Sequence, residues 1–162
     1  MNVETPKLPI IEQKTIAEKT CEVSFGLSQK EFNFLAGQYI RINVPKLLYS
    51  DPKGVSRVFS IVSSPNDKNK ISIAFRDSGS GFKRTLMELP PGSLIDIEGP
   101  FGYFTLPKNP SQSIIFIAGG IGITPCLSMI RFASEQKLAH QITLLYVNKN
   151  AKGVAYLDEL MA

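Results

Sequence analysis

The chain has few residues of the kinds that bind metals or form disulfide frameworks. Its 162 residues include two cysteines, Cys21 and Cys126, and a single histidine, His140. The cysteines lie far apart and lack the C-x-x-C spacing of a redox or metal pair. This spacing argues against a disulfide framework, a zinc site or a cysteine-bound iron–sulfur cluster within the chain. We therefore expect no metal, and we expect His140 to be a surface residue.

The sequence also lacks a block of charge of one sign. Eighteen Lys and Arg residues are scattered among fourteen Asp and Glu residues, for a formal net charge of +4. So mild an excess does not indicate a nucleic-acid partner. It fits an anionic small ligand and an acidic protein partner equally well.

No apolar run is long enough to be read as a membrane span. The apolar stretch 113–130, which contains no charged residue, is slightly shorter than the roughly 20 residues that a spanning helix needs. Three glycines and Pro125 interrupt it. The first ten residues, MNVETPKLPI, lack the basic start and apolar core of a signal peptide. We therefore expect a cytoplasmic protein without membrane insertion.

Up to about Pro107, the apolar residues come in short runs separated by turn residues. These runs are 21–28, 38–45, 56–64, 70–76 and 93–99. Their alternation and regular spacing predict antiparallel strands in a barrel or a sandwich. One helix is predicted over 81–89, because Phe82, Leu86 and Leu89 fall on one helical face.

After residues 107–110 the pattern changes to that of a βαβ fold with a parallel sheet. It predicts a strand at 114–118, a helix at 124–137, a strand at 141–147 and a helix at 154–161. A complete doubly wound nucleotide domain needs four to six strands. We therefore expect half of such a domain, with an open edge at 141–147 that a partner chain or further sequence would complete.

The most informative segment is IIFIAGGIGITP, residues 114–125, which predicts a buried strand that turns at glycines into a helix. Gly119, Gly120 and Gly122 let the backbone approach a ligand, and the helix beginning near Thr124 contributes a positive N-terminus. The segment differs from the G-x-G-x-x-G fingerprint. Two interpretations follow: a turn that binds a dinucleotide pyrophosphate, or a tight turn whose glycines serve packing only.

Four motifs in order carry a family resemblance: RVFS at 57–60, SGFKRTL at 80–86, EGPFGYFTL at 98–106 and AGGIGITP at 118–125. From about Gln13 to its C-terminus, the chain resembles the ferredoxin–NADP reductase-like family of flavoprotein reductases. The resemblance implies an FAD-binding antiparallel Greek-key β-barrel over 1–108. It also implies the first half of a parallel βαβ NAD(P)-binding domain over 109–162.

The first motif is Arg-x-Tyr-Ser in that family and Arg57-Val58-Phe59-Ser60 here. The resemblance implies that Arg57 pairs with a flavin phosphate. It also implies that the hydroxyl of Ser60 tunes the reactive edge of the flavin ring. Phe59 replaces the tyrosine, so ring stacking is kept and a phenolic hydrogen bond is lost. Without the resemblance, this segment is equally well an ordinary strand with Arg57 as a solvated edge charge.

The other flavin contacts implied by the resemblance come from a strand and from the turn into the predicted helix. They are Ile73, Ala74 and Phe75 beside the ring, and Ser80, Gly81, Phe82 and Lys83 at the pyrophosphate. Room for a second phosphate favours FAD over FMN. Ser80 also fits a plain helix cap, and both roles are compatible.

For the nucleotide half, the resemblance implies that the glycine segment holds the NAD(P) pyrophosphate. The residues implied are Gly119, Gly120, Ile121, Gly122, Thr124 and Pro125, with Thr124 near the nicotinamide. Lys149 does not decide between NADPH and NADH as the nucleotide. Cys126 is interpreted as a packed residue, and 99–102 as a structural turn before a strand beginning at Tyr103.

The function implied is hydride transfer from NAD(P)H to FAD and electron transfer on to an acceptor, which is a protein or a small molecule. No general base is required. Full family members carry a later Cys-Gly-Pro-type segment and often a C-terminal aromatic residue, and neither occurs in this sequence. The alternative is therefore a flavin-binding or interaction module without NAD(P)H activity of its own. A third interpretation is a barrel joined to an unrelated nucleotide-binding fragment, with no flavin.

Overall fold

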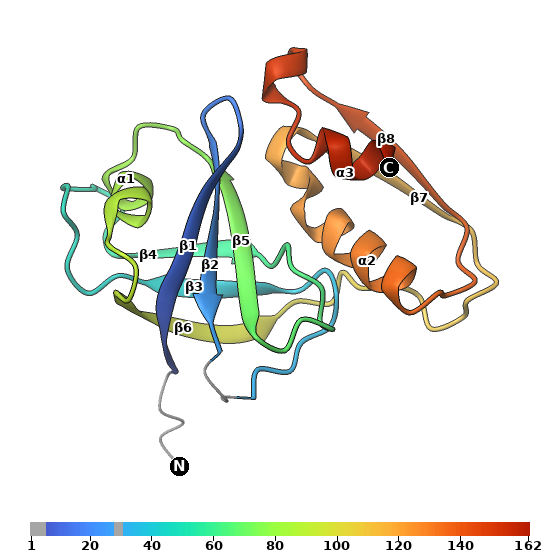
Figure 1. Ribbon diagram of the computed structural model, residues 1–162, viewed down its shortest axis with the longest axis horizontal. Helices are drawn as coiled ribbons and strands as arrows, with labels where there is room; N and C mark the ends of the chain where they lie inside the picture. Colours follow the sequence, from blue (N-terminus) through green and yellow to red (C-terminus); the bar gives the residue numbers. More distant parts are fainter. Residues whose placement is uncertain (1–5, 28–30) are drawn as a thin grey trace.

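The computed structural model describes residues 6–27 and 31–162 and places a large antiparallel sheet beside a small parallel one (Figure 1). The strands of the first part are β1 (Lys7–Ala17), β2 (Thr20–Gly26), β3 (Tyr39–Asn43), β4 (Ser56–Ser60), β5 (Lys70–Arg76) and β6 (Leu94–Phe101), with helix α1 (Gly81–Glu88) between β5 and β6. The second part consists of β7 (Ile114–Gly119), the 3-10 turn η1 (Gly120–Gly122), α2 (Ile123–Glu135), β8 (Ile142–Val147), the 3-10 turn η2 (Ala151–Gly153) and α3 (Leu157–Met161). Expectations for residues 1–5 and for Ser28 lie outside the described residues.

The six strands of the first part form one antiparallel sheet in the order β4-β3-β6-β1-β2-β5. Strands β1, β2 and β5 lie across β3, β4 and β6 (Figure 1), and the apolar core fills the space between the two halves. The edge strands β4 and β5 meet at one bridge, between Ile61 and Ile73, which continues in a hydrogen bond from the Val62 N–H to the Ser72 carbonyl. The predicted antiparallel fold is therefore confirmed, as a curled sheet with a seam between β4 and β5.

Strand β1 was not predicted from the sequence. Its segment, KLPIIEQKTIA, places charged residues among apolar ones without regular alternation. Pairing with β2 is irregular between Ile10 and Glu12 and again between Thr15 and Ala17. These irregularities break the period of two that identifies a strand in a sequence.

The expected strand at Tyr103 was wrong. Strand β6 continues through Gly99 and Pro100 to Phe101, and the Tyr103 side chain that follows is fully exposed. Residues 99–101 therefore extend β6, whereas a turn between two strands was expected over 99–102.

The second part begins with β7 and β8, which pair in parallel from Ile114 opposite Ile142 to Gly119 opposite Val147. Helix α2 covers one face of this sheet, and Phe116 and Ala118 are buried beneath it. The other face is bare, since Ile115 and Ile117 are exposed. This arrangement confirms the predicted start of a βαβ unit.

The ends of the second part differ from the expected boundaries. Helix α2 ends at Glu135, because Lys137 adopts a positive φ of 51°, which closes the helix. The expected helix over 154–161 begins only at Leu157, because Tyr156 also has a positive φ, 60°. The turn η2 precedes it.

The two parts share a core and several polar contacts. Ala36, Val62 and Ala74 of the first part pack in one apolar cluster with residues of α2 and β7. The Ser128 hydroxyl donates to the Ser63 carbonyl over 2.7 Å, and Arg131 donates to the Val62 carbonyl over 2.7 Å. The loop after β4 is therefore fixed against α2.

Among the described residues, no helix combines the length and the apolarity needed to cross a lipid bilayer.

Candidate functional site

The glycine segment lies where β7 ends, as the sequence predicted. Gly119 is the last residue of β7, and Gly120–Gly122 form η1 ahead of α2. Gly120 has a positive φ of 51°, which gives a local reason for glycine. At Gly119 and Gly122, an added Cβ would meet no atom within 4 Å. Packing within the described residues therefore does not require these two glycines, whereas a ligand against the backbone would use the space.

A cavity of about 450 Å³ opens at this segment. Its walls are Arg76, Gly119, Gly120, Ile121, Val147, Asn148 and Lys149. It lies at the carboxyl ends of β7 and β8, which is where open α/β sheets bind their ligands. Two basic side chains and no acidic one line it, so the cavity suits an anionic ligand such as a dinucleotide pyrophosphate.

Arg76, at the end of β5, was missed in the sequence because it belongs to the barrel part and lies far from the glycine segment along the chain. Its Nη2 donates to the Gly153 carbonyl over 2.9 Å, which holds the side chain beside the second part. Its Nε is buried and has no hydrogen-bond partner among the described residues, and the same holds for Oδ1 of Asn148. Both residues line the cavity and retain hydrogen-bonding capacity for a ligand.

Thr124 and Pro125 lie in the first turn of α2. The Thr124 hydroxyl donates to the Ile121 carbonyl over 3.2 Å and is buried. Pro125 is tolerated there because the N–H groups of a first turn have no partner within the helix. Cys126 is buried, and burial raises the pKa of its thiol, as expected of a packed residue and not of a reactive one.

The predicted flavin residues converge on the seam between β4 and β5. The rings of Phe59 and Phe75 lie 5.6 Å apart across this seam, and Phe59 stacks on Phe82 of α1 at 6.1 Å. Each edge strand pairs with one neighbour, apart from the bridge at Ile61, so backbone N–H and C=O groups along the seam are free of strand partners. Such groups can bond the polar edge of a flavin ring, so the seam fits that part of the cofactor.

The structure brings some of the predicted flavin residues to the seam and others to the core. Val58 is exposed and Ser60 is half-buried on β4. Ile73 is buried in the barrel core, whereas Ala74 packs in the cluster shared with α2. The Ile73 side chain therefore cannot contact a flavin ring at the surface, and only the Ile73 backbone lies at the seam.

Arg57 is held by an internal carboxylate. Its Nη2 lies 2.6 Å from Oδ1 of Asp51, and its Nη1 donates to the carbonyls of Lys53, Gly54 and Ser56. The guanidinium also lies over the ring of Phe82, 5.1 Å from its centroid. The predicted phosphate-binding arginine is therefore engaged with the loop before β4.

Asp51 also occupies the N-terminus of α1. Its Oδ2 accepts from the Phe82 N–H over 3.0 Å, and its side chain is only 2% exposed. These N–H bonds, from Phe82 and Lys53, together with Arg57 lower the pKa of Asp51 below its usual value. Asp51 thus holds two of the donors that the sequence assigned to the flavin phosphate, and it was missed because no family motif includes it.

Ser80 caps helix α1, as predicted. The Ser80 side chain accepts from the Lys83 N–H over 3.2 Å. A Cβ on Gly81 would collide with the backbone oxygens of Tyr49 and Ser50, so this glycine permits a close approach of two backbones. Lys83 donates to the Arg76 carbonyl over 2.7 Å, and burial lowers the pKa of its ammonium group.

Both parts of the chain match known proteins. Residues 7–106 match the model of the oxidoreductase FAD-binding domain, and residues 116–162 match that of the oxidoreductase NAD-binding domain. Ferredoxin–NADP reductase B of Sorangium cellulosum (strain So ce56) is 34% identical over 145 residues, which are 87% of this chain and 57% of the relative. Terephthalate 1,2-dioxygenase reductase component 2 of Comamonas sp is 30% identical over 126 residues, which are 77% of this chain and 35% of the relative.

Solved structures show the same fold. Phthalate dioxygenase reductase superposes with a TM-score of 0.81 at 28% identity, covering 97% of this chain and 48% of that one. Ferredoxin–NADP+ reductase from Plasmodium falciparum superposes with a TM-score of 0.78 at 26% identity, covering 96% of this chain and 63% of that one. The chain thus spans about half the length of these proteins.

Proposed function

The chain belongs to the ferredoxin–NADP reductase-like family of FAD-binding oxidoreductases, and we propose that it is the flavin-binding and nucleotide-binding portion of an NAD(P)H-dependent reductase. One observation carries the proposal. Strand β5 lines the flavin seam at residues 73–75, and its next residue, Arg76, lines the glycine cavity. Flavin and nicotinamide nucleotide bound at these two places are neighbours, as hydride transfer requires.

FAD, when bound, supplies the chemistry, because it accepts a hydride and releases electrons singly or in pairs. The chain's own residues bind and orient. The backbone at Gly119–Gly122 and the N-terminus of α2 hold the pyrophosphate of NAD(P)H, with Arg76 and Lys149 supplying positive charge. Thr124 would lie near the nicotinamide, and the Ser60 hydroxyl would hydrogen-bond the flavin edge.

We expect the flavin phosphate to compete with Asp51 for Arg57 and for the Phe82 N–H. All three groups lie together at the N-terminus of α1. A phosphate placed there meets a carboxylate of like charge unless the loop carrying Asp51 moves. Arg57 thus remains the proposed phosphate ligand, but its availability depends on Asp51.

We propose an electron-transfer protein as the acceptor. Support comes from the names of relatives, which include reductase components of a terephthalate 1,2-dioxygenase and of a 3-ketosteroid-9-alpha-monooxygenase, and a ferredoxin–NADP reductase. The choice between NADPH and NADH stays open, since Arg76 and Lys149 suit the pyrophosphate of either nucleotide.

The second candidate is a flavin-binding module without NAD(P)H activity of its own. The observation that favours it is the bare face of the β7–β8 sheet, on which Ile117 is 76% exposed and Val147 is 66% exposed. In this second candidate, the nucleotide-binding half supports NAD(P)H activity only when further strands and helices cover that face.

The test is to add FAD to the purified chain, record its visible spectrum, and then add NADPH or NADH without oxygen. The proposal predicts bound flavin whose yellow absorbance bleaches. Bound flavin that stays yellow supports the second candidate, and a protein that binds no flavin contradicts both.

A further inference from the structure

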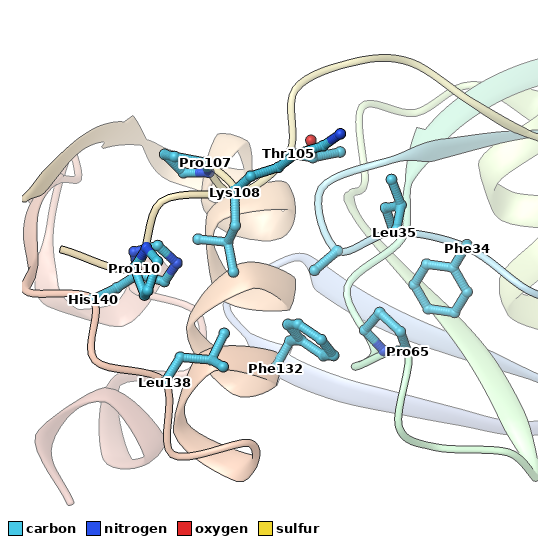
Figure 2. Close-up of a pocket in the computed structure, with 12 residues that line it drawn as sticks. Phe34, Leu35, Pro65, Thr105, Pro107, Lys108, Pro110, Phe132, Leu138 and His140 are labelled. Atoms are coloured by element: carbon cyan, nitrogen blue, oxygen red, sulfur yellow. The ribbon is translucent and has the colours of Figure 1, made fainter. Parts of the chain in front are cut away.

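A second cavity, of about 390 Å³, lies where the connection between the two parts passes α2 (Figure 2). Residues from four segments of the chain surround it, and apolar side chains from three of them face the cavity together. Phe34 comes from the segment before β3, Leu106 from the connection, and Phe132 and Leu138 from α2 and the residues after it. All four side chains are apolar, so the cavity offers a ligand mostly hydrocarbon surface.

This cavity is separate from the glycine site. The two cavities share no lining residue. Helix α2 begins beside the glycine segment at Ile123, and Phe132 lies nine residues further on, about 14 Å along the helix axis. A molecule bound in the second cavity therefore leaves the nucleotide site free.

Three prolines limit the backbone freedom of the walls of the second cavity. Pro65, Pro107 and Pro110 line it, and the fixed φ of proline limits the backbone motion of the segments that carry them. A cavity held open by its own backbone binds a ligand with little ordering cost. Its volume lies in the lower part of the range of small-molecule sites, which favours a small ligand.

The polar groups of the cavity select the charge of that ligand. Lys108 and His140 line it together with Thr105, and no acidic residue does. Lys108 is exposed at the surface and forms no ion pair with the described residues, whereas Nδ1 of His140 is buried without a hydrogen-bond partner among them. Hydrogen-bond donors and positive charge thus border an apolar space.

We propose that this cavity binds a small apolar carboxylic acid. Its hydrocarbon body packs against Phe132 and Leu138, and its carboxylate pairs with Lys108 at the rim. Because the ligand contacts the barrel part, the connection and α2 together, its binding stabilises the docking of the two parts and raises the unfolding temperature.

The test uses octanoate as the probe, with the full chain and without any cofactor. Calorimetric titration is expected to show saturable binding of one octanoate, and the unfolding temperature is expected to rise with its concentration. Binding of 1-octanol is expected to be weaker, because it lacks the charge. Amide NMR signals of Phe132 and Leu138 are expected to shift on binding.

Lys108→Glu is the variant and Lys46→Glu the matched control, because both lysines are exposed and only Lys108 lines the cavity. Lys108→Glu is expected to weaken octanoate binding roughly three- to tenfold, whereas Lys46→Glu leaves it unchanged. Absence of saturable binding overturns the proposal. So does equal binding of octanol and octanoate, an unaffected Lys108→Glu variant, or NMR shifts confined to the glycine segment.

Discussion

Among single residues, the glycines at the end of β7 serve two different purposes: one allows a backbone conformation, and the other leaves space for a ligand. Gly120 needs its positive φ, whereas Gly119 has an extended backbone (φ −118°) that other residues adopt freely. The space beside Gly119 is open. Packing within the described residues therefore gives no reason for glycine at this position, whereas a ligand against the backbone does.

Gly119→Val is accordingly expected to fold with a free energy of unfolding within about 0.5 kcal/mol of the parent. The new side chain occupies the space proposed for the pyrophosphate, so the dissociation constant for NADP+ is expected to rise at least about tenfold. Chemical unfolding and calorimetric titration measure the two effects. Ser113→Val, an exposed position just before β7, serves as the control for added bulk.

A second prediction concerns Asp51 and the dependence of stability on pH. Its pKa is lowered in the folded chain, so its ionised form stabilises the fold at pH values above the usual aspartate pKa. That contribution is lost as the pH falls below about 4 toward the lowered value. Asp51→Asn is therefore expected to be less stable than the parent at neutral pH and to approach it in stability at acid pH.

The same variant frees Arg57 from its ion pair, so Asp51→Asn is also expected to bind FAD more tightly at neutral pH. Denaturant titrations across pH and flavin fluorescence titrations measure these effects. A stability difference that stays constant through the acid range would contradict the role given to Asp51. Weaker FAD binding by the variant would contradict the competition.

Among the elements, α1 depends on its cap. The Ser80 side chain accepts the Lys83 N–H, and Ser80→Ala is expected to lower the free energy of unfolding by about 0.5–2 kcal/mol. Ser78→Ala, two residues earlier on the exposed loop, is the control and is expected to change little. Equal stability of both variants in urea would exclude the capping role.

The elements also show what the sequence could and could not predict. Strands with regular alternation, helix α1 with its serine cap and the strand–glycine–helix segment were all predicted, because their signals are local. Strand β1 was missed because its pairing is irregular. Arg76 and Asp51 were missed for another reason: each acts at a place built from distant segments. The seam itself follows from strand order, which local patterns do not determine.

In the whole molecule, the two parts are joined by a polar network around Arg131. Its guanidinium pairs with Glu159, at 2.6 and 2.7 Å, and lies over the ring of Tyr156, whose hydroxyl donates to Glu22 of β2 over 2.6 Å. Burial, followed by the charge of Glu22, raises the pKa of Tyr156 far above its usual value. The hydroxyl therefore stays protonated, and the bond persists in alkaline solution.

Tyr156→Phe removes the hydrogen bond between the two parts and leaves the Glu22 carboxylate without this donor. We expect a loss of about 1.5–3 kcal/mol in the free energy of unfolding. Thermal unfolding measures this loss. Tyr103→Phe is the control, because that side chain is fully exposed. Equal losses for the two variants would mean that the network does not hold the parts together.

In the proposed function, the flavin seam and the glycine cavity, joined by β5, hold their two cofactors side by side. The most direct test is the bleaching of bound FAD by NADPH or NADH under anaerobic conditions, compared between the parent chain and Gly119→Val. The flavin of the parent chain is expected to bleach, and the variant is expected to bind flavin equally well but to bleach far more slowly at the same nucleotide concentration, if the two cofactors lie side by side. Bleaching at the same rate in both would contradict this arrangement.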